Sequence, residues 1–232
     1  MPNRPLLQDD ARYPAFLERY QNDLGAFAAE VCGIELTPEL ALAYGFAGEP
    51  GARLSISSEL DERIDKIGSL APIALWNLLS RLNSRTLVAI PWGNVRSRWE
   101  RYVDLTQQIR RGPHAWLAEY ITISINRIFI SYAGAPGAAE IRFLTASHPE
   151  TLAGFFGDNL YWLMEDAQSI NEQCVAVIMS SLHSPDASVA MSAPARANNW
   201  FLSLTRARLN RDVGGPWHGV VIDAPKPLQT YA

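Results

Sequence analysis

The sequence contains two adjacent carboxylates, Glu165 and Asp166, whose position makes them candidates for reactive groups. They directly follow the apolar run Leu160–Met164, and turn-forming residues precede that run. A short apolar run with such boundaries predicts a strand that is buried on both faces, as in a parallel sheet. Ligands bind at the carboxyl ends of parallel strands, where a carboxylate can hold a metal-bound triphosphate for hydrolysis. The alternative is a strand followed by a solvated acidic turn.

The composition is that of a globular protein. Of the 232 residues, 48% are apolar and 19% are charged, which is enough to form a substantial core in one large domain. The net charge of −4 disfavours a basic surface over the whole protein, although a local basic patch is compatible with it. Cys32 and Cys174 lack the spacing of metal ligands, so we expect both to be small buried apolar side chains.

The sequence has no sign of membrane targeting. Its start is polar and no apolar run is long enough to cross a bilayer, which predicts a cytoplasmic protein with no membrane partner. We expect a flexible arm at residues 1–12, one domain at residues 13–224 and a tail at residues 225–232.

Helical and strand patterns recur along the predicted domain. Tyr13–Cys32 has apolar residues at helical spacing, and Thr37-Pro38 is typical of a cap followed by proline in the first turn of a helix. Runs of apolar and β-branched residues predict further strands at 54–57, 86–91, 121–132 (turning at Asn126-Arg127), 141–145 and 220–222.

Several segments of the chain, including the acidic pair, resemble the large terminase subunit of tailed phages. They are Phe27–Leu36, Thr145–Phe155 (TASHPETLAGF), Asn159-Leu160 with Glu165–Ala167, Ser181–Pro194, and Arg196 with Trp200-Phe201. The resemblance covers most of Phe16–Ala224 and implies an α/β fold with a mostly parallel central sheet and helices on both faces. That architecture is the P-loop NTPase fold of the ASCE/RecA-like type. The nuclease domain of the family has no room in this chain, so we expect none.

The phosphate-binding loop departs from the family. The strand at 54–57 should lead into a loop of the form G-x-x-x-x-G-K-[ST], whose backbone N–H groups and lysine hold phosphates. Here Lys66 precedes the one glycine, Gly68, so the motif is absent. Lys66, Gly68 and Ser69 remain as the candidate nucleotide-binding residues, and acidic residues before them would repel a phosphate.

The helix after this loop has two plausible starts. If it begins at Ser58, Pro72 kinks it. If it begins at Ser69, Pro72 lies in its first turn, where proline is tolerated.

The loop after the strand at 86–91 resembles the family segment that supplies an arginine to the terminal phosphate. At the matching position this chain has Asn94, and Arg96 and Arg98 follow. The resemblance implies that either arginine can take this role, and we name Arg96 as the catalytic candidate. The alternative is a solvated basic face on the helix that runs through Ile109.

The acidic pair also departs from the family, whose order is Asp then Glu. The resemblance implies that Glu165 takes the metal position and Asp166 the position that polarises water. Each carboxylate then moves by about one methylene, roughly 1.5 Å, and a misplacement on that scale can cost on the order of a hundredfold in rate. Elsewhere, Glu39-Leu40 replaces the adenine-reading amide and Ala193 replaces the polar coupling residue.

These departures predict a domain related to phage DNA packaging in which ATP hydrolysis is impaired or lost, a pseudo-ATPase. ATP and Mg²⁺ would bind weakly or not at all. The domain would act by binding phage packaging proteins, a host protein or DNA in the cytoplasm of the bacterial host. The competing hypothesis is an active DNA-packaging ATPase, a homo-oligomer completed by neighbouring subunits or a separate nuclease. A third is a structural interaction protein whose seven tryptophans serve as interface anchors.

Overall fold

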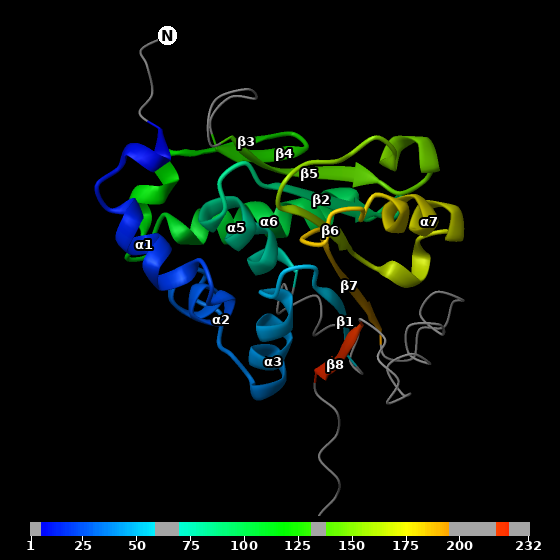
Figure 1. Cartoon of the computed structure of the whole chain (residues 1–232), viewed down its shortest axis with the longest axis horizontal. Coiled ribbons are helices and arrows are strands. Elements are labelled where there is room, and N and C mark those ends of the chain that lie inside the picture. Colours follow the sequence, from blue (N-terminus) through cyan, green and yellow to red (C-terminus); the bar gives the residue numbers. More distant parts are fainter. Residues whose placement is uncertain (1–5, 59–69, 131–137, 195–216, 223–232) are drawn as a thin grey trace, which may run out of the picture.

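A single eight-stranded sheet organises the protein (Figure 1). The computed structural model describes residues 6–58, 70–130, 138–194 and 217–222. The strand order is β3-β4-β5-β2-β6-β7-β1-β8. The parallel strands are β1 (Arg53–Ser58), β2 (Arg85–Ile90), β5 (Ala139–Thr145), β6 (Leu160–Met164), β7 (Ser188–Pro194) and β8 (His218–Ile222). The mostly parallel α/β fold expected from the sequence is therefore confirmed.

The predicted strands coincide with observed ones. The run Leu160–Met164 is β6, whose residues are all buried. The segment predicted to turn at Asn126-Arg127 forms an antiparallel hairpin of β3 (Ile121–Ser124) and β4 (Arg127–Ile130) at one edge of the sheet. Through β4 this hairpin pairs antiparallel with β5.

The sheet has a hydrophobic core on each face, because successive side chains of a strand point to opposite sides. In β2, Val88 and Ile90 belong to the larger core, whereas Leu87 and Ala89 belong to the smaller one. Helices α5 (Ala71–Ser80) and α6 (Val95–Ile109) cover the larger core, together with the N-terminal helices. Helix α7 (Glu172–Ser180) covers the other face (Figure 1).

The helix predicted over Tyr13–Cys32 is interrupted. It consists of α1 (Tyr13–Tyr20), the short α2 (Leu24–Ala26) and a π-helical turn (Phe27–Val31). Asp23 breaks the run because its side chain accepts a hydrogen bond from the Ala26 N–H and so caps a new helix. The apolar spacing predicts the buried face correctly, but it conceals the capping residue inside the run.

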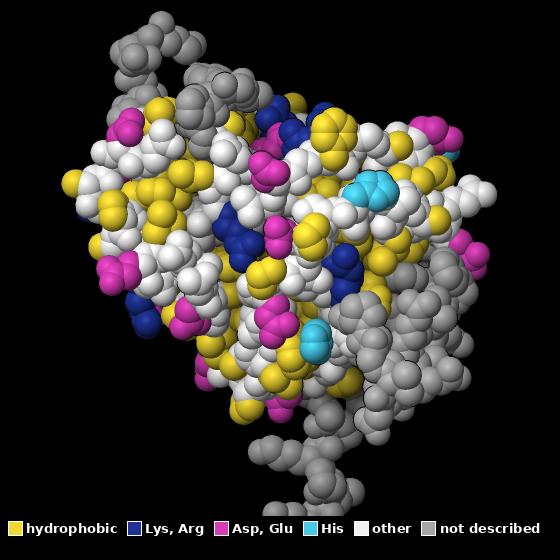
Figure 2. Space-filling model, viewed as in Figure 1, with side chains coloured by type: hydrophobic (Ala, Val, Ile, Leu, Met, Phe, Trp, Pro, Cys, Tyr) yellow, Lys and Arg dark blue, Asp and Glu magenta, His cyan; other side chains and the backbone are white. Residues whose placement is uncertain are grey.

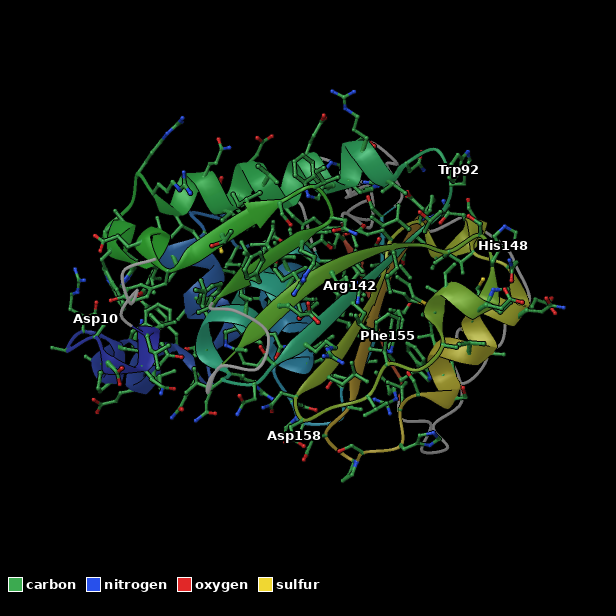
Figure 3. All side chains as sticks on the ribbon, turned by 90° about the horizontal axis from the view of Figure 1, so that it is seen from above. Asp10, Trp92, Arg142, His148, Phe155 and Asp158 are labelled. Atoms are coloured by element: carbon green, nitrogen blue, oxygen red, sulfur yellow. The ribbon has the colours of Figure 1, made fainter. Side chains whose placement is uncertain are left out.

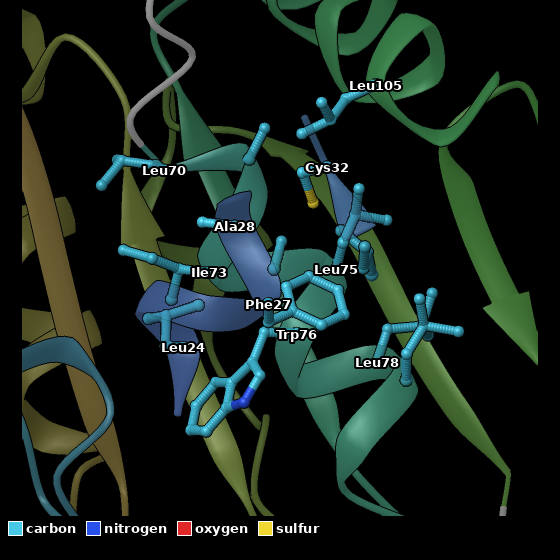
Figure 4. Packing of buried hydrophobic residues seen from close by; sticks show 14 of the residues in the cluster. Leu24, Phe27, Ala28, Cys32, Leu70, Ile73, Leu75, Trp76, Leu78 and Leu105 are labelled. Carbon is cyan, nitrogen blue, oxygen red and sulfur yellow. The ribbon is translucent and has the colours of Figure 1, made fainter. Parts of the chain in front are cut away.

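These N-terminal turns pack on α5. Leu24, Phe27 and Ala28 face Ile73 and Trp76 in the closely packed cluster of Figure 4. The buried Trp76 indole donates to the Tyr20 carbonyl oxygen at 2.8 Å, which links α5 to the end of α1. Cys32 and Cys174 are free and buried, as expected.

Two predicted helix starts can be compared with the structure. Helix α3 (Pro38–Ala47) begins after Thr37, whose hydroxyl accepts from the Leu40 N–H at 3.3 Å, so the predicted cap is confirmed. Helix α5 begins at Ala71 with Pro72 in its first turn, which favours the second of the two alternatives.

Four short 3-10 helices complete the described part of the chain. They are η1 (Leu7–Asp9), η3 (Ala115–Glu119), η4 (Pro149–Leu152) and η5 (Ala167–Ser169). Leu7 is buried, and the carboxylate of Asp10 accepts a hydrogen bond from the Tyr120 hydroxyl at 2.7 Å. Residues 6–10 of the expected arm therefore contact the domain.

The described surface is mixed in charge. Figure 2 shows acidic and basic side chains interspersed on one face of the molecule, with apolar side chains between them. Within the described ranges, no helix has the length and apolar character needed to span a membrane.

Helix α3 offers a matched test of packing. Leu40→Ala removes a side chain with no exposed surface and should lower the free energy of unfolding by about 2–5 kcal/mol, because it leaves a cavity. Leu42→Ala, on the same helix but 54% exposed, should change it by less than about 0.5 kcal/mol. Urea unfolding of both variants measures the difference. Equal losses would contradict the orientation of α3.

Candidate functional site

The two carboxylates of the sequence lie together at the carboxyl edge of the sheet. Glu165 and Asp166 follow β6 directly, and the Glu165 N–H donates to the Ala89 carbonyl oxygen of β2 at 3.0 Å. On the other side of β6, β7 brings Ser192 to the same edge. Parallel strands thus converge on this point, as expected for a ligand site in such a sheet.

Glu165 is a buried carboxylate with two hydroxyl donors. Its side chain is 5% exposed; Tyr102 Oη donates to Oε1 at 2.7 Å and Ser192 Oγ donates to Oε2 at 3.0 Å. Burial raises the pKa of Glu165, although the hydrogen bonds and nearby Arg98 oppose this effect. Burial and the neighbouring glutamate also raise the pKa of Tyr102, which therefore remains a hydroxyl donor.

Asp166 is held by an arginine and an amide. Arg98 binds both of its carboxylate oxygens, with Nη2 at 2.6 Å from Oδ1 and Nε at 3.0 Å from Oδ2. Asn94 Nδ2 donates to the same Oδ2 at 3.0 Å. The ion pair is shielded from water, since the side chains of Arg98 and Asp166 are only 9% and 13% exposed. A bidentate pair of this kind is among the stronger hydrogen-bonded contacts in proteins.

The backbone turns sharply at Asp166. Its φ of 51° and ψ of 47° lie in the left-handed region, where aspartate is one of the few side chains found with any frequency. This turn directs Asp166 toward α6, whereas Glu165, the preceding residue, remains in the strand direction and faces Tyr102 and Ser192. The two acids therefore have separate sets of partners.

Helix α6 separates the two candidate arginines. Residues two positions apart project about 200° apart around a helix, so Arg98 faces the sheet whereas Arg96 faces solvent. The Arg96 side chain is 90% exposed and forms an i,i+4 pair with Glu100 at 2.9 Å. The structure thus brings Glu165, Asp166 and Arg98 together and leaves Arg96 outside the cluster. A catalytic role for Arg96 stays a prediction.

Three members of the cluster have weak sequence signals. Arg98 and Tyr102 are one helical turn apart, on the stripe that continues to Leu105 and Ile109. An arginine on an otherwise apolar stripe indicates a buried partner. Ser192 is not among the residues predicted from the sequence, since the coupling position falls on its neighbour Ala193, which points to the other side of β7.

The loop after β2 exposes an aromatic side chain beside the cluster. Trp92 is 83% exposed. The next residue, Gly93, has a φ of 97°, which glycine adopts readily and other residues rarely do. Figure 3 shows Trp92 and His148 at the same end of the sheet, on the loops that follow β2 and β5. Trp92 precedes Asn94, the residue that donates to Asp166, by two positions.

Both carboxylates already have protein partners in the described residues, and a metal role for Glu165 stays a prediction. A magnesium ion needs oxygen ligands with available negative charge, but Arg98 already neutralises Asp166, and both oxygens of the buried Glu165 accept from hydroxyls. Within the described ranges there is no cluster of three or more His, Cys, Asp or Glu residues suited to a metal. The candidate nucleotide-binding residues Lys66, Gly68 and Ser69 lie outside the described residues.

The loss of one partner should reveal the energetic role of the ion pair. Arg98→Met leaves Asp166 shielded without its cation and should lower the free energy of unfolding by about 3–5 kcal/mol. Arg96→Met, two residues away, removes only an exposed pair and should change it little. Chemical denaturation compares the two variants. Similar values would argue against a shielded Arg98–Asp166 pair.

Glu165 should also leave a signature in the pH dependence of stability. Its pKa is raised in the folded state above the ordinary value near 4.5, so the folded protein binds the proton more tightly than the unfolded chain. The contribution of Glu165 to stability is therefore greatest below pH 4.5 and is lost as pH rises toward its folded pKa. Relative to wild type, Glu165→Gln should gain stability across that interval. Unfolding measured from about pH 4 to about pH 8 tests this, and a gain that did not grow with pH would contradict it.

Comparison with solved structures identifies proteins with a similar fold. No protein-family model and no curated protein sequence matches the chain. The large terminase ATPase domain of Thermus phage P74-26 is 16% identical, covers 83% of both chains and has a TM-score of 0.60. The large terminase of bacteriophage HK97 is 16% identical with a TM-score of 0.61 over 89% of this chain and 44% of that one.

A third structure carries a nucleotide analogue. It is the large terminase of a thermophilic bacteriophage in complex with ATP-γ-S, which is 10% identical, with a TM-score of 0.52 over 88% of this chain and 44% of that chain. This chain thus spans less than half of the longer terminases that it resembles. The described residues have the fold of phage large terminase ATPase domains.

Proposed function

We propose that this chain is a terminase-motor-like domain related to phage DNA packaging whose ATP hydrolysis is impaired or lost. The proposal combines the shared fold with the state of the acidic pair. The observation that carries it is the Arg98–Asp166 contact, in which both carboxylate oxygens are bound by a guanidinium from the same chain.

The local electrostatics support this proposal. A carboxylate that activates water must accept a proton or orient a donor, and its lone pairs must be available. Asp166 accepts three hydrogen bonds, which occupy most of its roughly four acceptor sites, and its charge is paired with Arg98. Desolvation favours the protonated form of Glu165. The terminase of the thermophilic bacteriophage was solved with ATP-γ-S, so binding of nucleotide by this fold is compatible with loss of its cleavage here.

The domain would then act through a partner, which we take to be a packaging protein, a host protein or DNA in the bacterial cytoplasm. Trp92 is a candidate contact, because of the tryptophans in the described ranges it is the one that lies largely in solvent. Tryptophan is enriched among the residues that dominate binding energy at protein interfaces.

ATP turnover tests the proposal directly. Purified full-length chain with Mg²⁺ and ATP should release no phosphate above background, and Glu165→Gln should leave that rate unchanged. Turnover on the order of 1 per second, typical of enzymes, that falls in Glu165→Gln would contradict the proposal. Activity that appears only at high protein concentration would instead support a homo-oligomer completed by neighbouring subunits.

Calorimetry separates binding from cleavage. ATP-γ-S with Mg²⁺ should bind weakly or give no heat at millimolar nucleotide. Micromolar binding that is lost in Lys66→Ala would mean that Lys66, Gly68 and Ser69 hold nucleotide and that only the chemical step is impaired.

A further inference from the structure

Four charged side chains share one face of the sheet at the end opposite to Glu165 and Asp166. The register pairs Arg127 of β4 with Arg142 of β5, and Arg85 of β2 with Glu140 of β5. Since Glu140 and Arg142 are two residues apart, all four side chains project from the same face.

The charges in this group do not balance. Glu140 binds Arg85 Nε at 3.0 Å through Oε1 and Arg127 Nη2 at 2.7 Å through Oε2, so both of its oxygens are engaged. Within the described ranges Arg142 has no carboxylate partner; its guanidinium lies over the Phe155 ring at 5.6 Å (Figure 3). Like charges directly opposite on paired strands are unfavourable, so Arg127 and Arg142 need a further anion.

Two donors in this pair lack an acceptor. Arg127 Nε and Arg142 Nε are both buried and make no hydrogen bond within the described part of the chain. A buried donor without an acceptor is costly, and such groups in proteins are usually satisfied by a side chain, water or ligand. The two orphaned donors belong to cross-strand neighbours, so positive charge and unmet hydrogen-bonding capacity gather at this place.

A cavity of about 180 Å³ opens beside Arg127, whereas its cross-strand neighbour Arg142 is not on the lining. Arg85, Arg127 and Glu140 line it, and Phe129 and Phe156 contribute aromatic surface. Asp158 also lies on its lining, but its carboxylate is exposed, and water screens its charge. Figure 3 shows Asp158 on a loop away from Arg142 and from the end of the sheet that carries Trp92.

We propose that this cavity binds a small ligand through a phosphate or carboxylate group. The oxyanion accepts hydrogen bonds from Arg127 and offsets the excess positive charge of Arg127 and Arg142. The apolar part of the ligand packs on Phe129 and Phe156. This site does not depend on the proposed function, since it lies at the amino-terminal ends of β2 and β5.

Inorganic phosphate and acetate are the first probes. Each is titrated into the full chain at constant ionic strength, with chloride as the reference, and binding is followed by calorimetry and thermal unfolding. We expect saturable binding of at least one of them, and the stronger binder identifies the oxyanion. Arg127→Gln removes the orphaned donor on the lining and should weaken this binding at least about tenfold. Arg142→Gln, which leaves both Glu140 ion pairs in place, should weaken it less, because Arg142 acts only through its charge.

Three further variants locate the site. Arg96→Gln, at an exposed arginine on α6, should bind the probe as wild type does. Glu140→Gln removes the competing carboxylate and should tighten binding severalfold. Lys66→Ala should have no effect, because Lys66 belongs to the separate candidate phosphate loop. Binding that is lost in Lys66→Ala but retained in Arg127→Gln, or no binding beyond the chloride reference, would overturn the proposal.

Discussion

Two adjacent carboxylates at the end of a fully buried strand need hydrogen-bond donors, and this need shapes one edge of the molecule. Glu165 and Asp166 leave β6 where solvent barely reaches, so each must be compensated by the protein. Helix α6 supplies Tyr102 and Arg98, and β7 supplies Ser192. The position of α6 on the sheet, and the loop that precedes it, are thereby tied to the end of β6.

Because the protein itself supplies these hydrogen-bond donors, the fold does not depend on nucleotide hydrolysis. The central strand β6 is apolar on both faces and buried, and nothing in that burial requires nucleotide hydrolysis. Once a guanidinium from the same chain neutralises Asp166, the acidic pair is stable without an added cation. The fold can therefore persist while the chemistry of its edge changes.

The two ends of the sheet differ in how their charged side chains are paired. At the carboxyl end each acid has its own set of donors: Arg98 and Asn94 bind Asp166, and two hydroxyls bind Glu165. At the amino end Arg85 and Arg127 share Glu140, Arg142 has no carboxylate partner in the described residues, and two buried guanidinium nitrogens there have no acceptor. Because buried donors at the amino end lack acceptors, a ligand can be expected at that end of the sheet as well as at the carboxyl end.

Local pattern determined every described strand except β7, together with the Thr37 cap and the place of the acidic pair, since apolar runs and capping residues act over a few neighbouring positions. The break at Asp23 was as local but was hidden by helical spacing on both sides. Only the tertiary structure decided which arginine meets Asp166, because the choice between Arg96 and Arg98 depends on how α6 is rotated against the sheet. Likewise, Ser192 and Arg142 acquired their significance from strand register, which joins residues far apart in the chain and has no signal in either segment by itself.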